Sequence, residues 1–158
     1  MSWRDATPSD LPDILRLVRG LAEYEKLEQE FHATEAGYAE AFFGPQPHAF
    51  AMLAEADGAA VAVCVWYRTF SSFAGRPAIW IEDIFVDPAH RKQGLARAAF
   101  ALLARRALNE GCAALEWNVL DWNAPAIAAY RAMGAVGREE WTDQRVSGDA
   151  LTLLAGKG

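Results

Sequence analysis

One short segment, Arg91-Lys92-Gln93-Gly94-Leu95-Ala96, combines basic side chains with a glycine just before an apolar pattern of helical spacing. A glycine followed two positions later by a small residue lets backbone N–H groups come close to a ligand. The first turn of a helix carries unpaired donors and about half a positive charge, which favours an anion such as phosphate. The segment therefore predicts a phosphate-binding turn, to which Arg97 adds a further cation. The alternative is an ordinary helix start beside basic residues.

Two adjacent carboxylates, Glu82 and Asp83, interrupt an apolar stretch at residues 78–86 that predicts a β-strand. Adjacent residues of a regular strand point to opposite faces of the sheet. We therefore expect the two carboxylates to have different roles.

Composition excludes several classes of protein. The 158 residues are 53% hydrophobic and 23% charged, as in an ordinary globular domain. The longest apolar run, Ala59 to Tyr67, is too short for a membrane span, and a net charge of −6 has the wrong sign for a nucleic-acid binder. His32, His48 and His90 show no metal-ligand spacing, so no metal site is expected. We expect a cytoplasmic protein.

The periodicity of apolar residues predicts alternating helices and strands. Cys64 and Cys112 are expected to be small buried hydrophobes, with a disulfide or a reactive thiol as the alternative. The order predicts a mixed α/β domain whose most informative unit is the βαβ crossover at 78–120. Strands are expected at 2–4, 49–56, 59–69, 78–86, 112–120, 135–141 and 150–155, and helices at 8–27, 34–43, 94–110 and 123–133.

The segment at 91–96 resembles the acetyl-CoA signature of the GNAT N-acetyltransferases, Arg/Gln-x-x-Gly-x-Gly/Ala after a strand. Three further segments resemble the spermidine/spermine (diamine) acetyltransferase subgroup: Leu21-Ala22-Glu23-Tyr24-Glu25, Ile81-Glu82-Asp83-Ile84-Phe85-Val86, and Trp122-Asn123-Ala124-Pro125-Ala126-Ile127-Ala128-Ala129-Tyr130. The resemblance spans nearly the whole chain. It implies a single domain, 1–158, with a central, mostly antiparallel twisted sheet, a parallel βαβ core and flanking helices.

The resemblance also implies how acetyl-CoA is held. Backbone groups of Ile84 and Val86 would pair with the pantetheine arm, and residues 91–97 would hold the diphosphate. The start of the next helix would contact the cofactor from the other side, although Asn123-Ala124-Pro125 is equally an N-cap with an early proline. The implied cofactor residues are Ile84, Phe85, Val86, Arg91, Lys92, Gln93, Gly94, Leu95, Ala96, Arg97, Asn123, Ala124, Pro125 and Ala126.

By the same resemblance, Tyr130 would be the general acid that protonates the departing sulfur, since a phenol of pKa near 10 suits a thiolate. Glu82 would recognise the acceptor amine and take part in its deprotonation, and Asp83 would be structural or orient its neighbours. The structural alternatives are that Tyr130 only packs against its helix and that the carboxylates are solvent-exposed without a role in binding. The implied acceptor site consists of Tyr24, Glu25, Glu82, Glu116, Trp117, Asn118 and Glu140.

The implied activity is acetyl transfer from acetyl-CoA to a primary amine of a small polyamine or diamine, by direct attack in a ternary complex. An alkyl amine is only about 0.04% neutral at pH 7, which costs about 4.6 kcal/mol. The amine must therefore be deprotonated within the site, through a water chain or by a partly desolvated carboxylate. A lysine-like amino acid such as thialysine is an alternative acceptor. A non-catalytic acyl-CoA-binding module and a protein-lysine acetyltransferase are alternative functions. Relatives of this kind are usually homodimers, which is an expectation by analogy here.

Overall fold

The computed structural model describes residues 2–156. The chain divides into two compact units, Met1–Asn123 and Ala124–Gly158, which are described separately below. The single domain 1–158 expected from the sequence stays a prediction.

The first unit is built on a mixed five-stranded sheet in which the strands follow chain order. The first four strands pair antiparallel, and the fifth pairs parallel with the fourth. This confirms the predicted fold class, a mostly antiparallel sheet that contains a parallel βαβ unit. The strands are β1 Trp3–Asp5, β2 Phe50–Ala56, β3 Ala59–Ser71, β4 Arg76–Val86 and β5 Leu115–Trp117.

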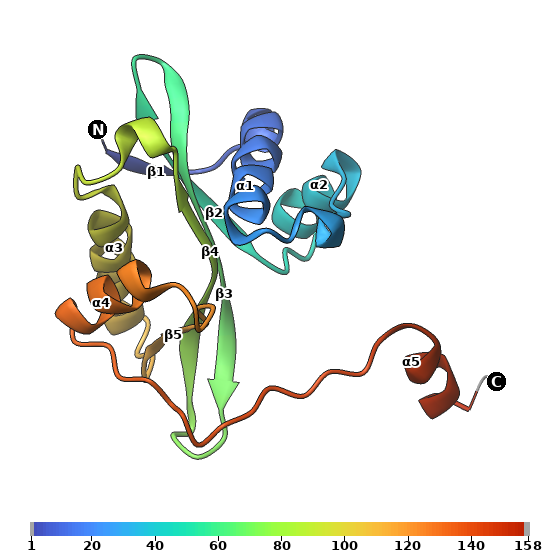
Figure 1. The fold of residues 1–158 in the computed structure, drawn as a ribbon. Coiled ribbons are helices and arrows are strands. Elements are labelled where there is room, and N and C mark those ends of the chain that lie inside the picture. The colour runs from blue at the N-terminus through green and yellow to red at the C-terminus, as the bar shows by residue number, and fades with distance from the viewer. Residues whose placement is uncertain (1, 157–158) are drawn as a thin grey trace. The chain divides into compact units, whose positions relative to one another are not determined.

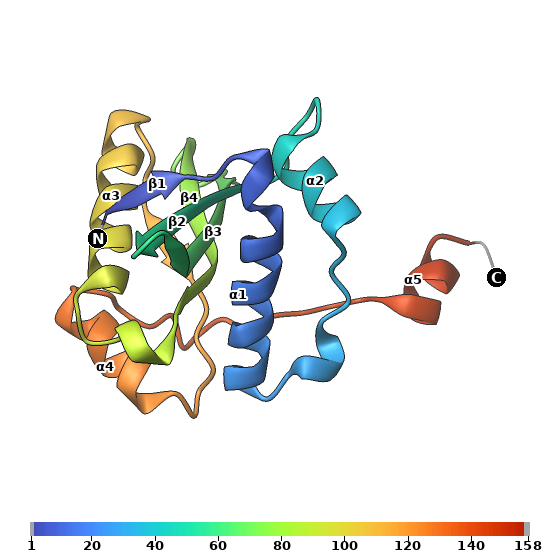
Figure 2. The same cartoon turned by 90° about the horizontal axis from the view of Figure 1, so that it is seen from above.

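Helices cover both faces of this sheet (Figures 1 and 2). α1 (Leu11–Glu25) and α2 (Glu35–Phe43) lie on one face, and α3 (Leu95–Asn109) lies on the other. Short 3₁₀ turns occur at Pro8–Asp10, Glu28–Glu30 and Pro88–His90. Beneath α1 and α2, a core of buried residues includes Ile14, Leu17, Phe42, Leu53, Val63, Val65 and Phe85. A smaller cluster on the α3 side contains Ala54, Val61, Ala62 and Leu95.

Local sequence explains where the helices begin and end. Thr34 caps α2 by accepting a hydrogen bond from the N–H of Gly37, at 3.1 Å. α1 ends at Glu25, two residues before the predicted end, because Lys26 adopts a left-handed conformation with φ +60°. A left-handed residue after the last turn is a common helix stop.

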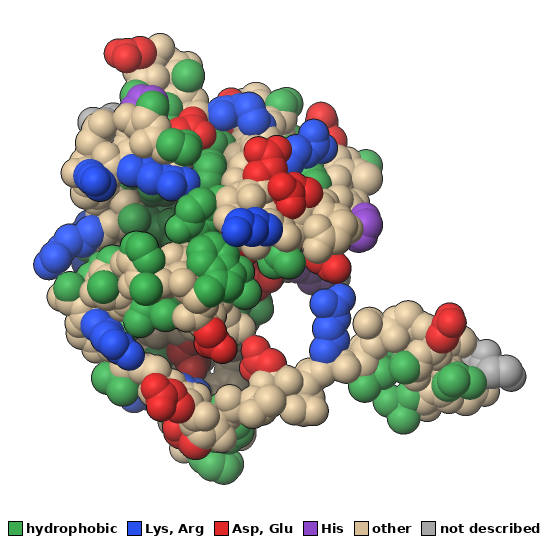
Figure 3. Space-filling view, viewed as in Figure 1, with side chains coloured by type: hydrophobic (Ala, Val, Ile, Leu, Met, Phe, Trp, Pro, Cys, Tyr) green, Lys and Arg blue, Asp and Glu red, His purple; other side chains and the backbone are tan. Residues whose placement is uncertain are grey.

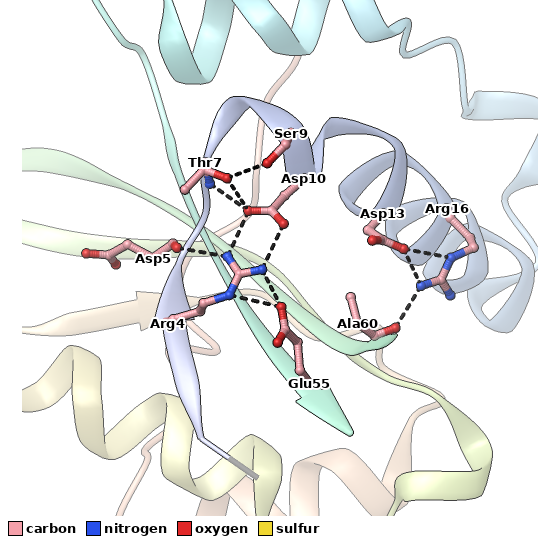
Figure 4. A network of polar contacts seen from close by, with 9 residues as sticks. All are labelled: Arg4, Asp5, Thr7, Ser9, Asp10, Asp13, Arg16, Glu55 and Ala60. Carbon is pink, nitrogen blue, oxygen red and sulfur yellow. Dashed lines mark hydrogen bonds and ion pairs between the residues drawn. The ribbon is translucent and has the colours of Figure 1, made fainter. Parts of the chain in front are cut away.

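A polar network fastens β1 to the start of α1 and to β2 (Figure 4). The two terminal nitrogens of Arg4 each donate to one carboxylate oxygen of Asp10, at 2.8 Å, and Arg4 also pairs with Glu55. Asp10 accepts further bonds from the N–H and hydroxyl of Thr7, and the guanidinium holds the pKa of this buried carboxyl well below its usual range. These bonds fix the point at which the chain leaves β1 and enters α1.

The second unit contains α4 (Ala124–Ala132) and α5 (Gly148–Leu154). The strands predicted at 135–141 and 150–155 were wrong. Residues 135–141 form no strand, since Gly137 and the charged run Arg138-Glu139-Glu140 suit a strand poorly. The second segment is helical instead: Ser147 stands at its N-cap, Asp149 lies in its first turn, and alanine and leucine favour a helix.

Two smaller findings concern cysteines and membranes. Cys64 and Cys112 are both free and buried, as predicted. Within residues 2–156, no helix combines the length and the apolar character that crossing a bilayer would need.

Candidate functional site

The loop that leads from β4 into α3 has the backbone geometry of an anion-binding turn. Lys92 and Gly94 both adopt left-handed conformations, with φ +61° and +79°. The side chains of residues 91–94 are exposed, whereas Leu95 is buried and anchors the helix start. The N–H groups of the first turn of α3 have no partner within the helix, and no acidic residue lies in that turn. The predicted residues 91–97 therefore form a positively polarised, exposed helix start.

The last part of β4 has an open edge. β5 pairs with β4 only over Ile79–Ile81, although β4 continues to Val86. The N–H of Asp87 points to β3, where it bonds to the carbonyl of Val61, so the backbone groups of Val86 and Ile84 point the other way. Among the described residues, no strand pairs with this edge. An extended ligand arm could add here as a strand does.

A β-bulge in β4 changes how its two carboxylates point. Val65 of β3 pairs with Asp83, and the next residue, Trp66, pairs with Ile81, so Glu82 is an extra residue. Trp66 lies beneath Arg106 of α3, whereas Val65 belongs to the core under α1.

Asp83 therefore faces the α1 side, and so does Glu82. Glu82 accepts a hydrogen bond from the Trp80 indole, at 2.9 Å, and also bonds to Tyr67, the cross-strand partner of Trp80. The expectation that the adjacent carboxylates face opposite sides was wrong, because a bulge suspends the alternation of a regular strand.

Burial and neighbouring carboxylates set the electrostatics of this face. Desolvation, together with the charges of Glu82 and Glu25, raises the pKa of Asp83 to about 7. Burial also raises the pKa of Glu25, at the end of α1, and burial and Asp83 raise that of Tyr38 to about 12. The face thus holds three carboxyl groups near one another, and it stabilises a cation that approaches them.

The residues predicted around β5 divide between the two faces. Glu116 is the β5 partner of Trp80, so it lies on the Glu82 face. Trp117 is the partner of Ile81, and its ring packs edge-on against Phe100 of α3, with 4.7 Å between centroids. The strand places Trp117 on the face opposite the carboxylates, where it contributes to packing beneath α3. Asn118 is exposed just after β5.

Tyr24 and Arg91, predicted to bind acceptor and cofactor respectively, contact each other. The guanidinium lies 4.9 Å above the Tyr24 ring, and its Nε donates to the carbonyl of Val86, at 3.0 Å. Asn123 is buried, and its side-chain oxygen accepts a hydrogen bond from the Tyr24 hydroxyl, at 3.3 Å. The structure thus brings together predicted residues of both kinds in the first unit.

The other predicted residues lie in the second unit. Ala124, Pro125 and Ala126 form the first turn of α4, and Tyr130 lies on the same helix, where its carbonyl accepts from the N–H groups of Met133 and Ala135. Glu140 is exposed in a turn. The roles of these five residues stay predictions.

Two aromatic residues beside Glu82, Tyr67 and Trp80, were not among the residues predicted from the sequence. Tyr67 and Trp80 are direct cross-strand partners, and both contact Glu82. Neighbouring aromatic residues in paired strands could have indicated their proximity. The bulge that unites them with Asp83 left no local signal.

The model of the acetyltransferase (GNAT) family matches residues 11–135 of this chain. The chain belongs to this family. It is therefore an N-acetyltransferase that uses acetyl-CoA, and its mixed sheet with flanking helices is that of an acetyltransferase domain.

Relatives of known activity match over nearly the whole chain. A thialysine N-epsilon-acetyltransferase of Bos taurus is 38% identical, covering 98% of this chain and 96% of its own. The L-ornithine N5-acetyltransferase of Arabidopsis thaliana is 28% identical, covering 96% and 86%. A human spermidine/spermine N(1)-acetyltransferase-like protein is 27% identical over 96% of this chain, but over only 23% of its own length.

A solved structure shares the fold at lower sequence identity. An integron cassette protein of V. cholerae superposes with a TM-score of 0.81 at 20% identity, covering 98% of this chain and 96% of its own. This similarity supports the fold alone.

The residues present suit the cosubstrate. A Cβ placed on Gly94 would meet no atom within 4 Å, so open space lies against the backbone that the diphosphate would approach. Lys92 and Arg97 stand exposed beside it. On the face in Figure 3, both basic and acidic side chains reach the surface. In the described part of the chain, no cluster of three or more His, Cys, Asp or Glu side chains is arranged to bind a metal.

Gly94 offers a test of the anion-binding turn. Gly94→Ala forces a side chain into a left-handed conformation, which costs about 1–2 kcal/mol, and displaces the N–H groups that follow. We expect coenzyme A to bind at least about tenfold more weakly by calorimetry, since 1.4 kcal/mol corresponds to a factor of ten.

Gly75→Ala is the matched control. Gly75 has φ +63°, is equally free of neighbours and lies in the β3–β4 turn. It should cost similar stability and leave coenzyme A affinity unchanged. Equal binding by both variants would contradict the assignment of the turn.

Proposed function

We propose that this enzyme acetylates the side-chain amine of a small cationic amino acid of the lysine class, with thialysine and ornithine as the nearest chemical models. The observation that carries the proposal is the β4 bulge, which sets Glu82 and Asp83 side by side on the face reached by Glu25. Full-length similarity to the bovine thialysine enzyme supports an amino-acid acceptor over the polyamine that the sequence motifs favoured.

In this proposal, the negative charge of the face that carries Glu82 and Asp83 binds the acceptor ammonium group. Ionised carboxylates attract an ammonium group, and the partly buried position of Asp83 strengthens that attraction relative to bulk water. Tyr67 and Trp80 hold the Glu82 carboxylate by hydrogen bonds in the free enzyme. Binding of an amine therefore costs less side-chain entropy at Glu82. Glu116, on the same face, adds a further negative charge.

Asp83 is suited to take the proton. Its pKa is about 7, whereas that of a lysine-like amine is about 10.4. The pKa difference between the amine and Asp83 is therefore roughly half the difference between the amine and an ordinary aspartate. Proton transfer to Asp83 is therefore less uphill than transfer to an exposed carboxylate. Acetyl-CoA supplies the activated acyl group as a thioester, and the α3 start and the open β4 edge orient it. Tyr130, carried by α4, supplies the proton for the departing sulfur.

The acceptor class is tested with a substrate panel. Release of free coenzyme A is measured with thialysine, lysine, ornithine, putrescine and spermidine at equal concentrations. We expect kcat/KM to be at least about tenfold higher for an amino acid than for either polyamine. Higher turnover of spermidine would support the polyamine assignment instead. If no amine is turned over, both the amino-acid and the polyamine assignments are wrong.

Asp83→Asn tests the proton acceptor. In the free enzyme, protonation of Asp83 below about pH 7 removes a negative charge from the acceptor face. The wild-type kcat/KM for the amine should therefore fall up to about tenfold per pH unit below 7, because this parameter reports the free enzyme. The variant should lose this inflection, whereas Asp57→Asn, the same change in the exposed β2–β3 turn, should keep it. An unchanged profile in Asp83→Asn would contradict the role.

Asp83→Asn should also change how the stability of the protein depends on pH. Because the folded-state pKa of Asp83 lies above the ordinary 3.8, the folded protein holds this proton more tightly than the unfolded chain. Wild-type stability therefore decreases as pH rises from about 4 to about 7, and Asp83→Asn removes this decrease. In thermal unfolding, the stability of the variant relative to the wild type should increase between pH 5 and pH 8.

Tyr130→Phe separates an enzyme from a non-catalytic acyl-CoA-binding module. The loss of a positioned acid should lower kcat by about 10²-fold or more, with the Kd for coenzyme A unchanged. Unaltered turnover would show that another group protonates the sulfur. A purified wild type that binds coenzyme A and turns over no amine would favour the binding module.

A further inference from the structure

Tyr24, near the end of α1, contacts two segments that are far apart in sequence. Its ring lies under the Arg91 guanidinium, at 4.9 Å, and its hydroxyl donates to the side-chain oxygen of Asn123, at 3.3 Å. Its ring also contacts Trp122, with 6.0 Å between centroids and an interplanar angle of 51°. One side chain therefore connects the loop before α3 with the last residues before α4.

Arg91 is held on its other side as well. Its guanidinium lies 5.6 Å from the ring centroid of Phe85, and its Nε bonds to the carbonyl of Val86. Phe85 is buried against α1, so closely that a Cβ on Gly20 would stand 2.9 Å from its ring. This contact fixes the end of α1 relative to β4, and with it the ring on which Arg91 rests.

These contacts account for the left-handed Lys92. The loop must turn sharply after Arg91 for the chain to reach the exposed Gly94 and begin α3. With Arg91 fixed at the loop's beginning and Leu95 buried at its end, the backbone between them has little freedom. A non-glycine residue stays in this conformation only where its surroundings determine it.

We propose that Tyr24 is a positioning residue for coenzyme A: it holds Arg91, and through it the phosphate-binding loop, against the segment Trp122–Asn123. This rests on the proposed function only in that both require coenzyme A at the α3 start. In this role Arg91 shapes the loop, and the diphosphate is bound by Lys92, Arg97 and the backbone N–H groups. The sequence had assigned Tyr24 to the acceptor amine instead.

The two roles of Tyr24 differ when no amine is present. If Tyr24 positions the loop, Tyr24→Leu weakens binding of coenzyme A alone, by about tenfold, since it removes both the aromatic face and the hydroxyl. Tyr24→Phe keeps the face for Arg91 and should recover most of the affinity. If Tyr24 contacts only the acceptor, both variants bind coenzyme A like the wild type and raise the KM for the amine.

The measurement is calorimetric titration of coenzyme A into each purified variant, with Phe73→Leu as control. Phe73 is fully exposed at the tip of the β3–β4 turn, so this change removes an aromatic ring without removing a contact of the site. We expect wild-type affinity from Phe73→Leu and a graded loss in the order Tyr24→Phe, then Tyr24→Leu. Wild-type affinity in Tyr24→Leu would overturn the proposal.

A double-mutant cycle keeps the proposal testable if Tyr24→Leu folds poorly. Arg91→Lys retains the charge but lacks the planar group that stacks on an aromatic ring and bonds to Val86. The losses of affinity in Tyr24→Met, which removes the aromatic face but keeps an apolar side chain that suits a helix, and in Arg91→Lys should combine non-additively, because each loosens the same loop. Strict additivity would overturn the proposal. Turnover plays no part in these titrations, so a wrong acceptor class would leave their outcome unchanged.

Discussion

The geometry of the site depends on one irregularity, the extra residue that β4 accommodates at Glu82. Over Ile79–Ile81, β4 is an interior strand with partners on both sides, and beyond Ile81 it pairs only with β3. The bulge therefore coincides with the point where β5 leaves the sheet. The same short stretch supplies both an open backbone edge and two carboxylates on one face. In the proposed function, the cosubstrate arm and the amine would meet there, because backbone groups face the edge while the two carboxylates face α1.

This arrangement carries an energetic cost that the rest of the first unit must offset. Asp83 is partly buried beside two other carboxyl groups, and its raised pKa reflects how unfavourable its charged form is in that place. Val65, its cross-strand partner, and Phe85, two residues further on, belong to the core that α1 and α2 cover. Apolar burial on both sides thus keeps β4 in register around a group that would otherwise favour hydration. Functional sites commonly retain strain of this kind.

Sequence predicted the parts of the structure that are decided locally. α3 and its start were predicted because glycine, basic residues and a helical stripe lie within a few positions of one another. The β2–β3 hairpin followed from Asp57-Gly58 between two apolar runs. The bulge could not be predicted, because it depends on how β4 pairs with β3. The sequence of either strand alone carries no signal for it. The strand predicted at 150–155 failed because Leu151 and Leu153 alternate as in a strand, whereas the local signals of a helix, Ser147 at the N-cap and Asp149 in the first turn, lie just before the predicted segment.

The end of α1 shows why the candidate residues could be found from the sequence while their surroundings could not. Tyr24 and Glu25 are adjacent, and both match one motif, so sequence placed them together at the acceptor. On a helix, neighbouring side chains are separated by about 100°, which sends them toward different parts of the molecule. Glu25 reaches the charge of Asp83, while Tyr24 lies against Arg91 and Asn123. In the proposed roles, one turn of α1 therefore contacts the acceptor face with one residue and the coenzyme A loop with the next, so a displacement of α1 would alter both. Phe85, buried against Gly20, opposes that displacement, and the same core contact would then align the amine with the cosubstrate.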